Sequence, residues 1–251
     1  MRIAVVSDIH GNRRALQAVL ADLRDVSPDA VVHGGDLAAG GTHPAEVIDQ
    51  IRAFGWTGVR GNTDEMLWAP ERLTAYAAAN PKIATLLAMV EQTIAPTVAS
   101  IGEERLRWLE ALPQRHVGDG FRLLHASPND LWRAPMPHAS DEELTKTYGS
   151  LGAPVVVYGH IHVSYVRQVG GMTVANTGSV SQSYDGDTRA SYLVMDGLPD
   201  EASGSTTDGV KCTIRRVEYD VQSEAEDLLR SGLPHAEWMA RILLAGRYIA
   251  P

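Results

Sequence analysis

Hydrophobic residues in the first quarter of the chain occur alternately in short continuous runs and at helical spacing. The apolar run that opens at Arg2 predicts a buried strand, and apolar residues then recur three and four positions apart over 15–23, with Asn12 placed to cap that helix. The same alternation predicts, in order, a strand over 29–36, a helix over 44–54 and a strand over 55–62. This βαβα order is typical of a mainly parallel sheet.

The middle of the chain has a different pattern. Alanine-rich and leucine-rich stretches with helical spacing predict a helical insertion over about 65–115. Beyond it the pattern predicts a strand ending at His125, a helix capped by Ser140 and Glu143, and a strand over 153–162. A hairpin turning at Gly170 and Gly171 follows, and then two strands near 190–196 and 211–219 joined by a polar loop. The chain closes with a helical tail over about 221–251, which opens with a capping box of Ser223 and Glu226. We expect a single domain over residues 1–251.

Charge and cysteine content narrow the range of partners and locations. The formal net charge is −9, so we expect no extended nucleic-acid binding, which depends on clustered Lys and Arg. Cys212 is the only cysteine in the sequence, which excludes an internal disulfide and favours a cytoplasmic location. The sequence shows neither a leader segment nor an apolar run long enough to span a membrane, so we expect no membrane contact. The apolar face around Trp238 in the last helix can pack on the core or on a second subunit, so a homo-oligomer stays an open alternative.

Polar side chains that can bind a metal follow the ends of five predicted strands. The set is Asp8, His10, Asp36, Asn62, His125, His160 and His162. Residues two apart on an extended chain point to the same side, so Asp8 and His10 are expected to project together, as are His160 and His162. The carboxyl ends of strands in an open α/β sheet border one crevice. Seven donors exceed what one catalytic ion takes, so they favour two ions. The other histidines are expected to be structural or surface groups: His33, His43, His116, His138 and His235.

The ordered motifs DIH, GGD, GNTD, LLHAS and GHIH resemble those of the calcineurin-like metallophosphoesterase superfamily, over residues 1–68 and 121–196. The resemblance implies an α/β fold, a four-layer α/β/β/α sandwich carrying the helical insertion and the C-terminal helices as additions. It also implies hydrolysis of a phosphate ester at a dinuclear centre. In that centre Asp8, His10 and His162 would hold one ion, Asn62, His125 and His160 the other, and Asp36 would bridge them. Oxygen and imidazole donors suit Mn, Fe, Zn or Co.

One position departs from the pattern of many superfamily members, which carry histidine after the Gly-Asn pair. Here that position is Thr63, whose hydroxyl is far too weakly acidic to protonate a leaving alkoxide near neutral pH. Leaving groups that need no proton are then favoured. Superfamily members that lack this histidine resemble phosphodiesterases more than monoesterases, so the resemblance implies a phosphodiesterase acting on a small or nucleotide-like substrate.

Three further residues are candidates for substrate binding. Arg133 and Arg60 could each grip a phosphate oxygen, and Trp132 could stack on a base or an aryl group. Alternative activities are a phosphomonoesterase or protein phosphatase and a dinucleoside polyphosphate hydrolase. A noncatalytic scaffold on the same fold, as in the retromer subunit that resembles this superfamily, is the alternative of a different class, although all seven ligand positions are filled here.

Overall fold

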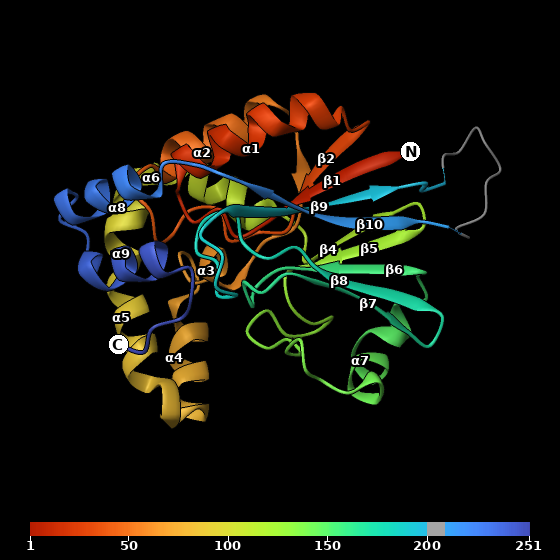
Figure 1. Cartoon of the computed structure of the whole chain (residues 1–251). Coiled ribbons are helices and arrows are strands. Elements are labelled where there is room, and N and C mark those ends of the chain that lie inside the picture. The colour runs from red at the N-terminus through yellow and green to blue at the C-terminus, as the bar shows by residue number, and fades with distance from the viewer. Residues whose placement is uncertain (200–208) are drawn as a thin grey trace.

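The computed structural model describes residues 1–199 and 209–251, and within these residues ten strands form two five-stranded sheets (Figure 1). The first sheet has the order β10-β9-β1-β2-β3 and consists of β1 (Arg2–Val6), β2 (Ala30–His33), β3 (Thr57–Gly58), β9 (Ala190–Asp196) and β10 (Lys211–Val217). The second has the order β4-β5-β6-β8-β7 and consists of β4 (Arg115–Gly118), β5 (Phe121–Leu124), β6 (Val155–Tyr158), β7 (Tyr165–Val169) and β8 (Met172–Asn176).

Parallel pairing is confined to one stretch of each sheet. Strands β1, β2 and β3 are parallel, as the βαβα order predicts, and so are β5, β6 and β8. Strands β9 and β10 pair antiparallel, as do β4 with β5 and β7 with β8. Both sheets are therefore mixed, and each places several strand ends at a common edge.

The two sheets pack face to face between helices, which confirms the four-layer α/β/β/α sandwich (Figure 1). Alternate residues of β1 face opposite layers, because successive strand side chains point to opposite sides. Ile3 and Val5 lie in the core between the sheets, whereas Ala4 and Val6 belong to the core under the outer helices. That outer layer contains α1 (Arg13–Val26) and α2 (Pro44–Ala53), and α7 (Asp141–Tyr148) covers the second sheet.

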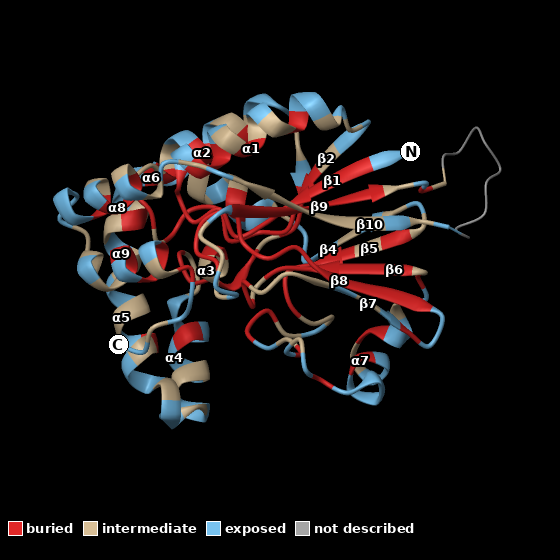
Figure 2. Cartoon of the chain, in the orientation of Figure 1, coloured by how far each residue is buried: buried red, intermediate tan, exposed pale blue. Residues whose placement is uncertain are grey.

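The remaining helices gather at one end of the sandwich, where Figure 1 places α4, α5, α8 and α9 together. The predicted insertion comprises α3 (Asn62–Glu65), α4 (Pro70–Ala79), η1 (Pro81–Ile83), α5 (Ala84–Gln92) and α6 (Ile94–Ala111), and the tail comprises α8 (Val221–Arg230) and α9 (Ala236–Ala245). A short 3-10 turn, η2 (Gly149–Leu151), follows α7. Figure 2 shows buried residues concentrated in the strands, while these end helices are largely intermediate or exposed.

In the part of the chain that the structure describes, no single helix is long and apolar enough to cross a membrane. The consecutive helical segments Pro81–Gln92 and Ile94–Ala111 reach that length and hydropathy only as a pair, and the pair is bent by 46°.

Several local predictions hold and two need correction. Asn12 Oδ1 accepts from Ala15 N, Ser140 Oγ accepts from Glu143 N, and the β7–β8 hairpin turns at its two glycines, as expected. The last predicted capping box is wrong, because Asp220 caps α8 by accepting from Ser223 N. The third strand is also shorter than predicted, since β3 ends at Gly58 and Asn62 opens α3. Most of the predicted polar loop lies outside the described residues.

Candidate metal centre

The turns that follow β1, β2 and β6 carry five of the seven candidate ligands in an uncommon backbone conformation. Strand β1 ends at Val6, so the extended arrangement predicted for the residues after it is wrong. The positive φ values are 58° at Asp8, 49° at His10, 53° at Asp36, 67° at His160 and 56° at His162. Non-glycine residues pay conformational energy in this region, and such residues cluster at functional sites. The side chains therefore converge through left-handed turns rather than along a strand face.

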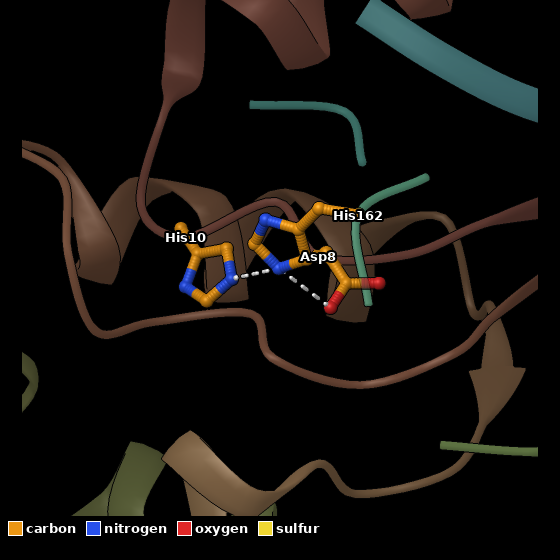
Figure 3. A group of neighbouring side chains, drawn as sticks. All are labelled: Asp8, His10 and His162. Atoms are coloured by element: carbon orange, nitrogen blue, oxygen red, sulfur yellow. Dashed lines mark hydrogen bonds and ion pairs between the residues drawn. The ribbon is translucent and has the colours of Figure 1, made fainter. Parts of the chain in front are cut away.

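Three of these side chains form the first group (Figure 3). His162 Nε2 lies 3.2 Å from His10 Nε2 and 3.2 Å from Asp8 Oδ1. All three residues are buried, and they come from the turns after β1 and β6, which belong to different sheets. Their ligand atoms are close enough together to hold one ion.

A second group of buried side chains, Asp8, Asp36 and His125, lies beside the first and shares Asp8 with it. Asp36 Oδ2 is 3.5 Å from His125 Nε2 and 3.7 Å from His10 Nε2, so this carboxylate lies between histidines of the two groups. Asn62 Oδ1 is 2.8 Å from His125 Nε2 and 2.9 Å from His160 Nδ1. The structure thus brings all seven predicted residues together.

The hydrogen bonds behind the histidines decide whether the cluster fits a metal. Backbone carbonyl oxygens accept from Nδ1 of three rings: Ala39 O at 2.7 Å from His10, Gly34 O at 2.9 Å from His125 and Gln182 O at 2.6 Å from His162. Such bonds fix the tautomer of a metal-binding histidine. With their protons on Nδ1, His10 and His162 point two Nε2 lone pairs at each other. Only a shared positive charge makes that contact favourable, so the donor set fits a metal ion.

Burial and neighbouring charges keep the ligands in their metal-binding protonation states. Burial would raise the pKa of Asp8, but the imidazoles of His162, His125 and His10 hold that pKa well below its usual range. Burial lowers the pKa of His10, and burial together with His125 lowers the pKa of His160 to about 4. These shifts favour an ionised carboxylate and neutral imidazoles. His125 differs, because burial would lower its pKa but the carboxylates of Asp36 and Asp8 raise it.

Asp64 and Gly61 support Asp36, and Asp64 was not singled out from the sequence. The buried Asp64 carboxylate accepts from Asp36 N at 2.8 Å, Leu37 N at 2.9 Å and Gly61 N at 3.0 Å. Burial and the nearby Asp36 raise the pKa of Asp64 to about 6. A Cβ added at Gly61 would lie 2.0 Å from Asp36 Oδ1. The motif GNTD contains both residues, but only the folded chain shows that they position the loop after β2.

A cavity of about 270 Å³ opens over the cluster, and one of the three predicted substrate residues lines it. Trp132 lines it and packs on Tyr76, with ring centroids 5.3 Å apart. Arg133 lines a neighbouring hollow instead, with its guanidinium 5.4 Å from the Tyr76 ring. Arg60 points away, donating to the carbonyl oxygens of Glu110 and Leu112.

The cavity also receives residues that the sequence pattern did not connect with the site. His235, Trp238 and Met239 reach it from the start of α9. His235 was expected to be a structural or surface histidine, yet its ring borders the same space as His10 and His160. Residues of a terminal helix carry no motif, so only the fold could reveal them.

Comparison with known proteins agrees with the geometry. The chain is 30% identical, over 98% of both sequences, to the uncharacterized protein MJ0912 of Methanocaldococcus jannaschii. It is similar in structure to a metallophosphoesterase from Sphaerobacter thermophilus, with a TM-score of 0.75, 26% identity and 98% and 99% of the two chains covered. The hypothetical protein PH1004 from Pyrococcus horikoshii OT3 shares the fold, with a TM-score of 0.79, 19% identity and 98% of each chain covered. The sequence profile of the calcineurin-like phosphoesterase superfamily domain matches residues 1–197, and the chain therefore belongs to that superfamily.

Proposed function

We propose that this protein hydrolyses phosphodiesters at a centre of two divalent transition-metal ions. The observation that carries the proposal is the opposed pair of lone pairs on His10 Nε2 and His162 Nε2, 3.2 Å apart, with both Nδ1 atoms bonded to carbonyl oxygens. Superfamily membership over residues 1–197 supports the reaction class. Mn, Fe, Zn and Co all suit this mixed oxygen and imidazole donor set.

In this proposal the two groups of side chains divide between two ions. Asp8, His10 and His162 hold the first ion, while Asn62, His125 and His160 hold the second and Asp36 bridges them. The position of Asp36 Oδ2 between His10 and His125 supports the bridging role. When bound, such a pair of ions supplies a nucleophile from water at neutral pH and stabilises negative charge on the phosphoryl oxygens.

The chain's own residues hold and orient this centre. The carbonyl oxygens behind His10, His125 and His162 fix the three rings, and Thr63 N donates to Asp36 Oδ1 at 2.9 Å. Thr63 also lines the cavity, and within the described residues its buried hydroxyl has no hydrogen-bond partner. That hydroxyl is free to donate to a phosphoryl oxygen.

The same residue supports diesters over monoesters. Thr63 occupies the position at which an imidazole would protonate a leaving alkoxide, and a threonine hydroxyl does not release a proton near neutral pH. A leaving group that departs as a stable anion, such as an aryl oxide, removes that need. We therefore expect aryl esters to be hydrolysed faster than alkyl esters, and the resemblance to superfamily members that lack the histidine favours diesters over monoesters.

The test is hydrolysis of bis(4-nitrophenyl) phosphate and 4-nitrophenyl phosphate by protein stripped of metal and reconstituted with Mn²⁺. The diester should be the better substrate, and Asp36→Asn should lower its kcat/KM by about 100-fold or more, because the bridging charge is lost. Asp25→Asn, which changes an exposed carboxylate on α1, is the matched control and should retain activity. A preference for the monoester would refute the diester assignment. Absence of turnover with all four metals would support the scaffold alternative.

A further inference from the structure

The cavity above the candidate metal centre has two chemically different sides. Five of the proposed ligands form its polar side: His10, Asp36, Asn62, His160 and His162. Much of the opposite wall is apolar and includes Leu86, Met89 and Val90 of α5, Trp132 of the loop after β5, and Trp238 and Met239 of α9. A group bound to the ligands would therefore project toward hydrocarbon and aromatic surface.

Part of this wall remains accessible although it is apolar. Leu86, Met89 and Val90 are only half-buried, whereas Leu87 on the same helix is 6% exposed and belongs to the main core. Accessible apolar surface is unfavourable in water, and an apolar group that covers it gains free energy in proportion to the area removed from water. The wall thus favours ligands with an apolar portion.

The charge of the cavity lining argues against nucleoside polyphosphates as substrates. No lysine or arginine from residues 1–199 or 209–251 lines the cavity. A nucleoside polyphosphate bound within this cavity would find no cationic side chain in the lining for its second and later phosphates. The cavity volume of about 270 Å³ also lies slightly below the roughly 300–1,000 Å³ typical of pockets for drug-sized ligands, so the organic group must be compact.

We propose that the cavity selects an ester of a single phosphoryl group whose organic part is compact and apolar, an aryl or branched alkyl group. The proposal rests on the proposed function, because the metal centre would hold the phosphoryl group while the apolar wall holds the organic part. His235 is one of the polar residues of the lining outside the proposed ligand set. Its buried Nε2 has no hydrogen-bond partner in the described part of the chain, so one hydrogen-bonding substituent on the organic part can be accommodated.

The test uses phosphonates, which are not hydrolysed, so that binding is measured without turnover. Phenylphosphonate, methylphosphonate and 2-hydroxyethylphosphonate are titrated into the Mn²⁺-loaded protein by isothermal calorimetry at several temperatures. Phenylphosphonate should bind roughly 10–100-fold more tightly than methylphosphonate and with a more negative heat-capacity change, the marker of apolar burial. Equal affinities, or tighter binding of 2-hydroxyethylphosphonate than of phenylphosphonate, would overturn the proposal.

Two leucine variants test whether the apolar wall causes the preference for phenylphosphonate over methylphosphonate. Leu86→Gln makes the α5 side of the cavity polar and should reduce the phenyl-to-methyl affinity ratio severalfold. Leu244→Gln is the matched control, since Leu244 lies on α9 outside the cavity and is 46% exposed. An unchanged ratio in Leu86→Gln would count against this wall as its source. The comparison of ligands on the unsubstituted protein stands even if one variant fails to fold.

The substrate-class proposal and the function proposal can fail separately. Preferential binding of phenylphosphonate without hydrolysis of any ester would support the ligand class and refute the phosphodiesterase. Hydrolysis of diesters with no preference for phenylphosphonate over methylphosphonate would support the phosphodiesterase and refute the ligand class.

Discussion

Gly61 is the residue at which the loop around Asp36 is most sensitive to an added atom. Gly61→Ala would place a Cβ 2.0 Å from Asp36 Oδ1, and the φ of −102° at Gly61 allows alanine without backbone strain. Because the added Cβ would also lie 2.6 Å from Asp36 N, the variant must shift both the Asp36 carboxylate and the backbone of the loop after β2. We expect Mn²⁺ affinity to fall roughly 10–100-fold, the usual effect of disturbing a group that positions a ligand. Calorimetric titration with Mn²⁺ measures this directly.

Gly149→Ala is the control for that substitution. Gly149 has no positive φ, and an added Cβ would meet its nearest neighbour, Thr145 Cγ2, at 3.5 Å, an ordinary contact. Its Mn²⁺ affinity should match that of the unsubstituted protein. Equal affinities in Gly61→Ala and Gly149→Ala would mean that the Asp36 carboxylate does not contribute to metal binding.

Residue types were easier to predict from the sequence than their conformations. Aspartate and histidine after an apolar run indicate ligands wherever the strands end, and the structure does bring Asp8 and His10 together with His162. The extended spacing argument was wrong for these residues, because β1 ends at Val6 and left-handed turns follow. Backbone strain at non-glycine residues leaves no mark in a hydrophobicity pattern, since tertiary hydrogen bonds stabilise it.

At the scale of single elements, two candidate caps compete at the start of α8. The side chain of Asp220 accepts from Ser223 N at 2.9 Å, so Asp220 caps the helix that the sequence pattern assigned to Ser223 and Glu226. Asp220→Ala should lower the free energy of unfolding by about 1 kcal/mol, the typical cost of losing an N-cap side chain. Glu226→Ala, which removes the side chain that a capping box at Ser223 requires, should change it less. Urea denaturation of both variants tests this, and a larger loss in Glu226→Ala would restore the original assignment.

The wrong capping prediction at α8 shows that a local sequence pattern alone does not determine where a helix starts. The sequence Ser-x-x-Glu occurs at 140–143 and at 223–226, yet only the first serine caps a helix. Aspartate at 220 offers a competing cap three residues earlier, and a helix starts where its first backbone donors find the better acceptor. The prediction for α2 is correct to within one residue at each end, whereas the helical spacing over 15–23 stops three residues before the end of α1.

At the scale of the whole molecule, the placement of the end helices could not be predicted from sequence. Helical spacing indicated that an insertion over 65–115 and a C-terminal tail exist, but not that α5 and α9 border one cavity with His10. Contacts between segments roughly 150 residues apart depend on packing that no local pattern records. The resemblance supplied the sandwich, whereas the shape of the substrate space came only from the fold.

The metal centre should also stabilise the molecule as a whole, because its ligands follow strands of both sheets. Asp8 and Asp36 follow β1 and β2 of the first sheet, whereas His125 and His162 follow β5 and β6 of the second. Bound ions would therefore tie the two sheets together at one end. A ligand that binds only the folded state at 100 times its Kd adds about 2.7 kcal/mol to the free energy of unfolding. We expect Mn²⁺ at such a concentration to give this increment and EDTA to remove it.

The measurement is urea unfolding followed by both far-ultraviolet circular dichroism and tryptophan fluorescence. If residues 1–251 behave as a single domain, as we propose, the two transitions should coincide and move together on adding Mn²⁺. Asp36→Asn should lose most of the increment, while Asp25→Asn should keep it. A Mn²⁺ effect of equal size in Asp36→Asn would place the ion elsewhere. Separate transitions, with only one shifted by the metal, would mean that α4, α5, α8 and α9 unfold independently of the sheets, because the proposed centre joins the sheets and receives no ligand from these four helices.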